Sequence, residues 1–400
     1  MNWKIYKMHI VIFTHPNFLD SQSMSRYANY LIEGMCERGH NVVYWTARAR
    51  FYKLKAPKSL KKWLGYIDQY IVFPFEVMFR LFKQNKNTLF VFTDHALGPW
   101  VPLVKNRNHI IHCHDFIALQ SAQGFIKENQ TKWTGKYYQA YIRWGFKQGK
   151  NFICISQKTQ EDLHTLLGYK PKCSEIVYNG LNQPFVPRNV SEVRALLSKQ
   201  FKIDLQNGYL LHVGGNQFYK NRKGVIELYS SWRKMSSSVL PLLMIGQIPT
   251  STLIKCWKQT TYKNDIYFLD KINDVQLRKA YQGASIFLFP SLAEGFGWPI
   301  AEAMASGCPV LTTDEAPMSE VAGDAGFLIP RQPLEDKASK IWAYEAATLI
   351  EDIILMEDSE RALCIQKGLI NSKRFDPVIS LNRIEQIYRN ILKRDEKPCT

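Results

Sequence analysis

The chain has 400 residues, of which 46% are hydrophobic and 22% are charged, the proportions of a soluble globular protein. Four hundred residues suit two domains better than one, and no apolar run reaches the ~20 residues that a bilayer-spanning helix needs. The net charge of +17 is uneven, because residues 1–190 contain 26 Lys and Arg against 11 Asp and Glu. Such a one-sided field predicts an acidic partner: an anionic membrane, a phosphorylated substrate or nucleic acid.

The N-terminus and the cysteines indicate the cytoplasm. Residues 1–14 lack the apolar segment and the small-residue cleavage site of a signal peptide, and are typical of a short basic lead before a strand. The eight cysteines form no Cys-x-x-Cys pair and are scattered through apolar segments, as expected of reduced and buried thiols.

The first elements predict a β-α-β unit. An apolar run over residues 9–14 is typical of a buried strand, helical spacing of apolar residues follows over 24–35, and a second strand is expected at 42–45. The turn over residues 15–23 contains no glycine, so the glycine-rich fingerprint of dinucleotide-binding proteins is absent. A nicotinamide- or flavin-dependent dehydrogenase is therefore not expected.

Residues 50–82 are both basic and aromatic. Five lysines over 53–62 are interleaved with aromatic residues and leucines such as Tyr52, Leu60 and Trp63. Two interpretations remain open. The segment either inserts aromatic side chains among lipid headgroups while its lysines meet anionic phosphates, or forms a helix packed on the first domain with a solvated basic face.

Further strands are expected at residues 88–93, 109–113, 151–155 and 174–178. His114 and Asp115 follow the second of these strands, where side chains commonly face a ligand cleft. His112 and His114 would share one strand face, but no third ligand follows at a useful spacing, so no metal site is expected. Ser156 is predicted to be the N-cap of the helix after the next strand.

A second α/β pattern follows the proline-containing linker at residues 183–189. Its strands are expected at residues 209–213, 239–246, 266–269, 285–289 and 309–312, and the last helix at 378–393. The whole pattern predicts two doubly wound α/β domains in tandem. We expect an N-terminal domain over residues 1–185, a C-terminal domain over 186–375, and a C-terminal helix in 376–400 that packs back toward the N-terminal domain.

The most informative stretch is residues 287–310, which predicts a strand, a glycine-broken loop, a helix over about 300–306 and the start of another strand. Pro299 suits the first turn of the helix and Gly307 the position just past its end. Glu294 and Glu302 can both point into one pocket at the carboxyl end of a strand, where open α/β sheets bind ligands.

Residues 290–310, P-S-L-A-E-G-F-G-W-P-I-A-E-A-M-A-S-G-C-P-V, resemble the E-x7-E motif of retaining glycosyltransferases of the group 1 class, which includes many bacterial polysaccharide and lipopolysaccharide enzymes. The resemblance extends to E-V-A-G-D-A-G (320–326), H-V-G-G-N-Q-F-Y-K-N (212–221) and I-S-Q-K-T-Q-E-D-L…V-Y-N-G-L (155–181). It implies the GT-B fold, in which two Rossmann-like doubly wound domains face each other across a cleft.

The resemblance also implies roles in binding a nucleotide-sugar donor. Glu302 is similar to the glutamate that holds the ribose, and Glu294 to the residue that contacts the donor sugar and stabilises charge developing on its anomeric carbon. The backbone N–H groups of Gly295, Phe296 and Gly297 would serve the hexose or a phosphate at the helix N-terminus.

The departing diphosphate needs fixed cations, which the family supplies from the loop after the first strand of this domain. Lys220 matches that cation, with Arg222 and Lys223 as alternatives. Gly215 and Asn216 stand where the family more often has a glycine-arginine step, so the second cation stays open. In the first domain, His114 resembles the cleft histidine that meets the donor sugar or the acceptor.

The sequence therefore predicts a cytoplasmic hexosyltransferase, peripheral on the inner face of the membrane. It would move a hexose from a UDP- or GDP-sugar to a lipid-linked or polysaccharide acceptor, with retention of anomeric configuration. No Asp-x-Asp motif occurs, so neither a metal nor another cofactor is expected. An anionic membrane surface is a further expected partner, through the basic N-terminal domain.

Two alternatives remain. The chain could be another GT-B nucleotide-sugar enzyme, such as an epimerase or a sucrose-type synthase, which product analysis with and without an acceptor would distinguish. A basic nucleic-acid-binding protein is disfavoured, because no recognition motif accompanies the basic and aromatic segment, and no nucleic-acid partner is expected.

Overall fold

The structure is a computed structural model that describes residues 7–19 and 22–394. The chain forms two compact units: residues 1–180 together with 377–400 make the first, and residues 181–376 make the second. The basic lead that we expected before the first strand, and residues 20–21 of the glycine-free turn, lie outside the described residues. Within the described ranges, no helix combines the length and the hydropathy that crossing a bilayer requires.

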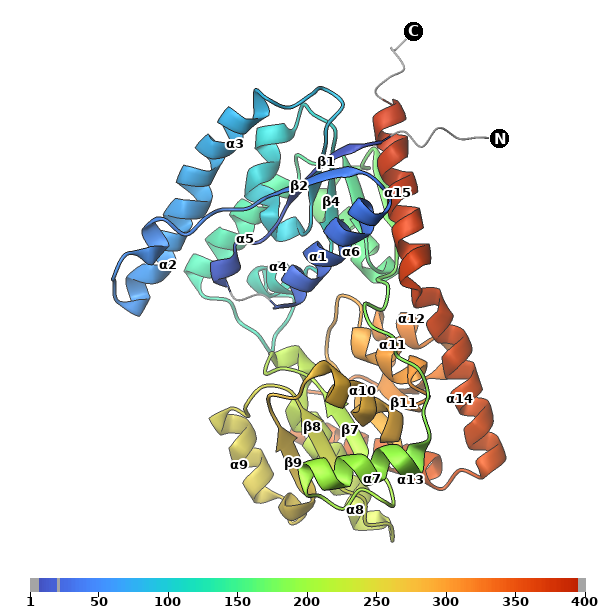
Figure 1. Ribbon diagram of the computed structural model, residues 1–400. Helices are drawn as coiled ribbons and strands as arrows, with labels where there is room; N and C mark the ends of the chain where they lie inside the picture. The colour runs from blue at the N-terminus through green and yellow to red at the C-terminus, as the bar shows by residue number, and fades with distance from the viewer. Residues whose placement is uncertain (1–6, 20–21, 395–400) are drawn as a thin grey trace, which may run out of the picture. The chain divides into compact units, whose positions relative to one another are not determined.

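A six-stranded parallel sheet forms the centre of the first unit (Figure 1). Its strands are β1 (His9–Phe13), β2 (Asn41–Trp45), β3 (Leu89–Phe92), β4 (His109–Cys113), β5 (Asn151–Cys154) and β6 (Cys173–Ile176). They lie in the order β2-β1-β3-β4-β5-β6, so the direction of winding reverses between β1 and β3. The inner strands β3, β4 and β5 are buried throughout, which explains their continuous apolar runs, whereas the edge strands β2 and β6 are not.

The second unit contains another six-stranded parallel sheet. Its strands are β7 (Leu210–Val213), β8 (Leu242–Ile245), β9 (Ile266–Leu269), β10 (Ile286–Phe289), β11 (Val310–Thr313) and β12 (Phe327–Ile329). They lie in the order β12-β11-β10-β7-β8-β9, and the winding reverses between β7 and β10. The predicted fold class of two doubly wound α/β units is therefore confirmed.

Helices flank both sheets (Figure 1). Those of the first unit are α1 (Gln22–Glu37), α2 (Lys58–Ile67), α3 (Phe73–Leu81), α4 (Ile117–Gln123), α5 (Trp133–Phe146), α6 (Gln157–Leu167) and α15 (Pro377–Arg394). Those of the second unit are α7 (Val190–Phe201), α8 (Arg222–Met235), α9 (Ser251–Gln259), α10 (Asp274–Gly283), α11 (Trp298–Ala305), α12 (Met318–Ala322), α13 (Asp336–Ile354) and α14 (Asp358–Ser372). Ser156 caps α6 by accepting a hydrogen bond from the Thr159 amide, as the sequence predicted.

The core of the first unit is aromatic. Phe13 stacks on Phe92 with ring centroids 4.5 Å apart, and Phe73 and Trp100 pack against the same ring. All four side chains are fully or almost fully buried. Since burial of one such side chain stabilises a fold by about 1.5–3 kcal/mol, this cluster anchors α3 and the segment after β3 to the sheet.

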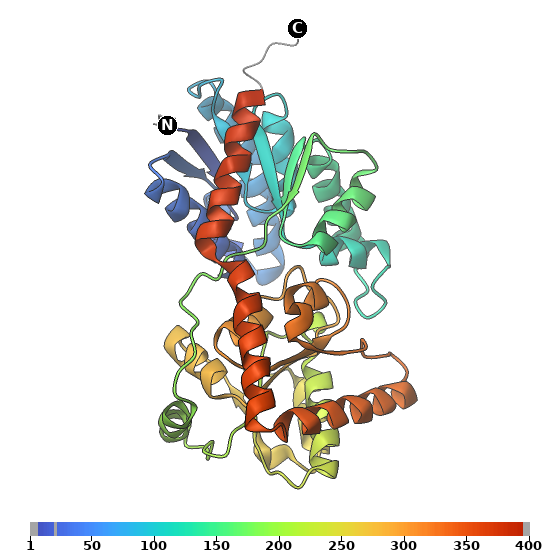
Figure 2. The ribbon, with the colours of Figure 1, turned by 90° about the vertical axis from the view of Figure 1, so that its right-hand side faces the viewer.

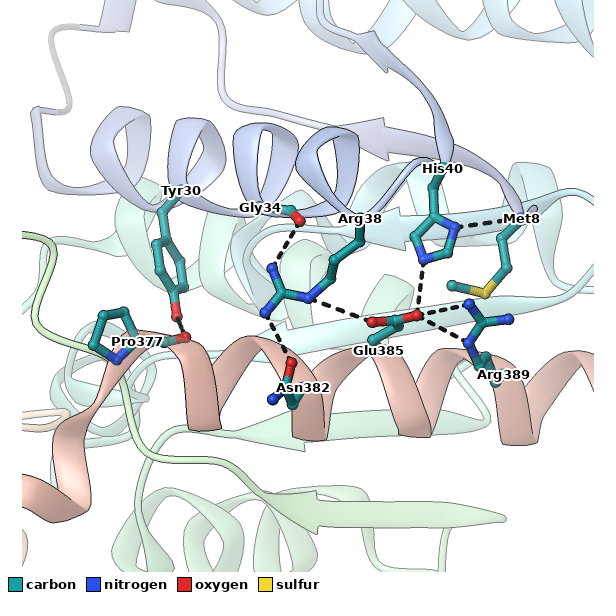
Figure 3. Close-up of polar contacts among 9 residues, drawn as sticks. All are labelled: Met8, Tyr30, Gly34, Arg38, His40, Pro377, Asn382, Glu385 and Arg389. Carbon is teal, nitrogen blue, oxygen red and sulfur yellow. Dashed lines mark hydrogen bonds and ion pairs between the residues drawn. The ribbon is translucent and has the colours of Figure 1, made fainter. Parts of the chain in front are cut away.

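The last helix, α15, packs along α1 of the first unit (Figures 2 and 3). Tyr30 donates a hydrogen bond of 2.9 Å from its hydroxyl to the carbonyl of Pro377. Leu381 packs so closely on Gly34 that a Cβ atom there would lie 2.6 Å from the leucine side chain. These contacts make the C-terminal helix an integral part of the first unit.

Glu385 is the polar centre of this helix pair (Figure 3). Its carboxylate lies 3.3 Å from Nε of Arg38, 3.1 Å from Nε2 of His40 and 2.7 Å from Nη2 of Arg389. Burial raises the pKa of Glu385, but the hydrogen bonds and charges of Arg389 and His40 outweigh burial and hold this pKa below its ordinary value. The ionised carboxylate therefore joins the turn between α1 and β2 to α15.

Candidate active site

The winding of the second sheet identifies where a ligand can bind. In open α/β sheets, ligands occupy the space beyond the carboxyl ends of the strands at the point where the winding reverses. In this unit that point lies between β7 and β10, and the loops after these strands contain residues 214–221 and 290–297. The two segments singled out from the sequence are thus adjacent in the fold.

Lys220 and Glu294 meet at this point. The Lys220 ammonium lies 2.8 Å and 2.9 Å from the two carboxylate oxygens of Glu294, and the two side chains are only 16% and 8% exposed. The ammonium also lies 5.1 Å from the ring centroid of Phe289, the last residue of β10. The structure therefore brings together the cation and the carboxylate that the sequence proposed separately.

Asn221 ties the two loops to each other. It adopts a left-handed conformation with φ of 49°, and its side-chain oxygen accepts a hydrogen bond from the amide of Gly224 at the start of α8. Its side-chain nitrogen donates to the carbonyl of Pro290 at 2.9 Å. This role was not predicted from the sequence, although an asparagine before a helix is a recognised N-cap signal.

The loop after β7 is also joined to the loop after β8. A Cβ atom at Gly246 would lie 2.0 Å from the carbonyl oxygen of Gly214, so these two backbones can approach only without a side chain at Gly246. Asn216 accepts a hydrogen bond of 2.6 Å from Arg222 and donates from its side chain to the carbonyl of Ile248 at 2.8 Å. Gly215 lies between Gly214 and Asn216, so the residues on both sides of it are fixed by these contacts.

Arg222 and Lys223 occupy different positions from Lys220. Arg222 is only 5% exposed and donates to Asn216 and to the carbonyl of Gln247, and burial lowers its pKa. Lys223 has a 63% exposed side chain paired with Glu227, 3.3 Å away and one helical turn on. The geometry makes Arg222 a brace between two loops and places Lys223 on the outer face of α8, so only Lys220 of the three contacts Glu294.

His212 lies beneath the same loop, inside β7. Its Nδ1 donates to the carbonyl of Leu288 at 2.9 Å, which joins β7 to β10, and burial lowers its pKa to about 3. The imidazole is therefore neutral at pH 7. A Cβ atom at Gly214 would lie 2.9 Å from Nε2 of this ring, so the first glycine of the loop is packed on the histidine.

Glu302 lies on α11, which begins immediately after the glycine loop. Gly297 has φ of 99° and Pro299 occupies the first turn, while Phe296 is buried. The Glu302 carboxylate accepts a hydrogen bond of 2.9 Å from the hydroxyl of Tyr281, a buried residue of α10. Burial, with the Glu302 charge as a second cause, raises the pKa of Tyr281 well above its usual value, so this hydroxyl remains a donor that orients the carboxylate.

A second polar cluster lies at the reversal point of the first sheet. His15 follows β1, Asp94 and His95 follow β3, and His114 follows β4. Asp94 lies 2.9 Å from Nε2 of His15 and 2.8 Å from Nδ1 of His95. His114 bonds the carbonyl of Thr93 at 2.9 Å and packs edge-on against Tyr27. The sequence found only His114 of this cluster.

Charges within the cluster are balanced by Asp94. Burial raises the pKa of Asp94, but the neighbouring His95 and His15 outweigh it and hold this pKa well below its ordinary value. Burial lowers the pKa of His95, yet the Asp94 carboxylate raises it above its ordinary value. For His114, burial dominates and the pKa is lowered. The cluster thus combines an ionised carboxylate with two imidazoles, His95 and His114, whose pKa values are shifted in opposite directions.

From the sequence, His112 and His114 could have formed a pair of metal ligands. In the structure, His112 instead forms hydrogen bonds inside the first unit. Its Nδ1 lies 2.7 Å from the hydroxyl of Tyr27 and its Nε2 2.8 Å from that of Tyr388 on α15. Among the described residues, no group of three or more His, Cys, Asp or Glu side chains is arranged so that it could hold a metal ion.

Two doubly wound Rossmann-like units in one chain, each with polar side chains at the reversal point of its sheet, are typical of the GT-B fold. Two family profiles match the chain: "Glycosyl transferases group 1" over residues 193–346 and "Glycosyltransferase Family 4" over residues 24–183. The chain belongs to the group 1 glycosyltransferases of the GT-B fold.

Relatives of this chain include enzymes of bacterial polysaccharide synthesis. It is 25% identical over 242 residues to "O-antigen chain mannosyltransferase B" of Escherichia coli, an alignment that covers 60% of each chain. It is 23% identical over 260 residues to "O-antigen chain mannosyltransferase RfbU" of Salmonella typhimurium, with 64% of this chain and 65% of the relative covered. Both alignments span less than two thirds of the relative's length.

Solved structures share the fold over nearly the whole chain. HepE from Anabaena, in complex with UDP and glucose, matches with a TM-score of 0.69 and 16% identity, over 96% of this chain and all of that one. At this identity the likeness concerns the fold.

Proposed function

We propose that this glycosyltransferase moves a hexose from a UDP- or GDP-sugar to a lipid-linked or polysaccharide acceptor, with retention of anomeric configuration. The observation that carries the proposal is the buried Lys220–Glu294 pair beside the reversal point of the second sheet. A donor there would meet a cation, a carboxylate and the N-terminus of α11 together. The mannosyltransferase relatives make mannose the first hexose to test.

In the proposed complex, Glu302 holds the ribose. A carboxylate can accept hydrogen bonds from two hydroxyl groups at once, as two adjacent ribose hydroxyls require, and the hydroxyl of Tyr281 orients this carboxylate. Gly295, Phe296 and Gly297 would present backbone N–H groups to the hexose or the diphosphate at the start of α11, where the helix dipole favours negative charge.

Lys220 is proposed to stabilise the leaving group. As the bond between the anomeric carbon and the phosphate oxygen breaks, negative charge accumulates on the diphosphate, and a fixed cation lowers the energy of that state. Glu294 holds the ammonium before the donor binds and is proposed to face the positive charge that develops on the sugar. The acceptor hydroxyl bonds to the anomeric carbon on the face that the diphosphate leaves, and its proton passes to the departing phosphate oxygen. Configuration is thereby retained.

The acceptor is proposed to bind at the first unit, where His114 and the Asp94 cluster offer hydrogen-bonding groups to sugar hydroxyls. The basic first unit is proposed to keep the protein at the cytoplasmic face of an anionic membrane. No metal is assigned a role in this proposal, because Lys220 supplies the positive charge that the leaving group needs.

The test follows donor consumption with UDP-glucose, GDP-mannose and ADP-glucose, with and without EDTA, in the presence of bacterial membranes as the acceptor source. We expect consumption of one UDP- or GDP-sugar, unaffected by EDTA, and its loss in Glu302→Ala and Lys220→Ala, whose circular dichroism should match wild type. Lys234→Ala, an exposed lysine of the same helix α8, is the matched control. Full activity of both site variants would contradict the site, and an unaltered product profile without membranes would indicate an epimerase.

A further inference from the structure

One long helix of the first unit exposes an apolar stripe. α2, a π-helical turn at Asp68–Val72 and α3 run without a break over residues 58–81. One side of this helix packs Phe73 and Val77 into the core. The other side presents seven large apolar side chains that are 45–87% exposed: Leu60, Trp63, Ile71, Phe75, Met78, Phe79 and, just past the end, Phe82. A helix on a domain surface normally has a polar outer face, so this stripe requires a partner.

α5 carries a second stripe, which the sequence analysis did not find. Trp133, Tyr137, Tyr141 and Trp144 recur at helical spacing and are 71%, 72%, 39% and 54% exposed. The opposite side of α5 packs Ile142 and Phe146 into the same core cluster that α3 enters. Both helices therefore cover one core with their inner faces and expose aromatic side chains on their outer faces.

Ring contacts join the two stripes into one surface. Trp63 contacts Tyr66, and Tyr66 stacks on Tyr138 of α5 at 5.4 Å. Further contacts lead from Tyr70 to Tyr141, and from Tyr141 to Trp144 at 5.8 Å. We call the two stripes and these linking tyrosines the aromatic surface. Exposed apolar patches of this extent on a soluble domain mark interaction sites.

The surroundings of the aromatic surface are basic. Residues 50–86 and 125–150 contain 15 Lys and Arg but only three Asp and Glu. Two of these acids are engaged within the protein: Asp68 is buried and accepts backbone hydrogen bonds from residues 50–52, and Glu76 pairs with Arg50 and Arg80. Exposed lysines such as Lys62 and Lys136 therefore border the surface with little opposing charge.

We propose that the aromatic surface docks on an anionic bilayer, with Trp and Phe side chains inserted at the level of the headgroups and lysines against lipid phosphates. Tryptophan and tyrosine favour this interface, and basic rims favour anionic lipid. A nucleic acid or a soluble glycan would leave the phenylalanines of α3 in water, and a second copy would bring two basic rims together. The choice of a bilayer rests in part on the proposed function, since a lipid-linked acceptor lies in a membrane.

The proposal predicts that apolar contact, rather than charge alone, supplies most of the affinity. Charge attraction is screened within ~10 Å at 0.1 M salt and within ~3 Å at 1 M salt, whereas apolar insertion persists. Flotation with vesicles of phosphatidylglycerol and phosphatidylcholine should therefore show wild-type binding at both salt concentrations. Phe79→Ser/Phe82→Ser on α3, and separately Trp133→Ser/Tyr137→Ser on α5, should each lower the vesicle affinity at least about tenfold.

Tyr344→Ser/Leu355→Ser is the matched control, because these side chains of the second unit are 61% and 62% exposed. It should bind vesicles as wild type does. The proposal is overturned if wild type dissociates completely at 1 M salt, if both aromatic variants bind unchanged, or if sedimentation shows a wild-type dimer that the aromatic variants dissociate. Turnover of the donor by wild type, with bacterial membranes as the acceptor source, is measured in parallel. Intact vesicle binding without any turnover contradicts the proposed function alone, and intact turnover without aromatic-dependent binding contradicts the docking surface alone.

Discussion

The Lys220–Glu294 pair can be dissected with Lys220→Met, Glu294→Gln and the double variant Lys220→Met/Glu294→Leu. The two side chains are 16% and 8% exposed, so either single variant leaves the other group largely buried without its partner. Breaking a fully buried pair costs about 3–5 kcal/mol, and an exposed pair contributes about 0–1 kcal/mol. Because the pair is mostly but not fully buried, we expect Lys220→Met to lower the free energy of unfolding by about 2 kcal/mol.

The double variant separates stability from catalysis. It leaves no unpaired charge, so its free energy of unfolding should lie within about 1 kcal/mol of wild type. Its donor turnover should nevertheless remain about 100–1,000-fold below wild type, as in Lys220→Met, because the cation that stabilises the leaving group is absent from both. Urea unfolding and donor consumption measure the two quantities on the same samples. A double variant that regains turnover together with stability would refute the catalytic role of the pair.

Three further predictions concern the scaffold of the two units. Asn221→Ala removes both the cap on Gly224 and the bond to Pro290 and places alanine at a φ of 49°, so urea unfolding should show a loss of about 2–3 kcal/mol; a loss below about 0.5 kcal/mol would contradict the tether. Asp94→Asn removes the charge that raises the pKa of His95, so burial should lower this pKa below ~6.5. NMR titration of the imidazole measures the change, and an unchanged pKa would contradict the pairing with Asp94. Glu385→Ala should destabilise the first unit by about 1–2 kcal/mol at pH 7. Since the pKa of Glu385 is lowered on folding, this contribution is present above its unfolded pKa of ~4.3 and is lost as the pH falls through the folded value, so thermal unfolding of variant and wild type should converge in acid and diverge at neutral pH.

Much of the fold follows from the spacing of apolar runs. Strands buried on both faces, such as β4 and β10, appear as short continuous apolar segments, and the helices between them keep a helical period, so two doubly wound units could be predicted. The order of the strands in each sheet could not be predicted. In the second sheet β7 lies beside β10, although 76 residues separate His212 from Leu288, and this pairing depends on tertiary packing that no local pattern encodes.

Residues of the candidate site could be predicted where they belong to a recognisable sequence motif. Glu294 and Lys220 were named from separate segments, but their direct contact follows from the reversal of winding between β7 and β10. Lys223 matched the sequence pattern almost as well as Lys220, yet the first turns of α8 rotate it outward to Glu227. Asp94 was missed because a lone carboxylate after a strand has no local signature, and its histidine partners come from two segments 80 residues apart, at His15 and His95.

The basic and aromatic segment at residues 50–82 shows another limit of prediction from the sequence. The sequence left open whether residues 50–82 meet a membrane or pack as a helix, and the structure shows that the helix does pack, through Phe73 and Val77. It also shows that packing leaves the opposite side apolar and adds α5 to the same surface. Periodicity alone could not show which apolar side chains of this segment would be buried, because α3 carries large apolar side chains on both its inner and its outer side.

The most direct measurement is NMR-monitored turnover of nucleotide sugars by this protein, with bacterial membranes as the acceptor source and wild type compared to Lys220→Met/Glu294→Leu. We predict that wild type consumes one UDP- or GDP-sugar, that the first-formed product keeps the anomeric configuration of the donor, and that the double variant, folded as stably as wild type, consumes it at least about a hundredfold more slowly. Turnover of none of the donors by wild type, or turnover at the wild-type rate by the folded variant, would contradict the account.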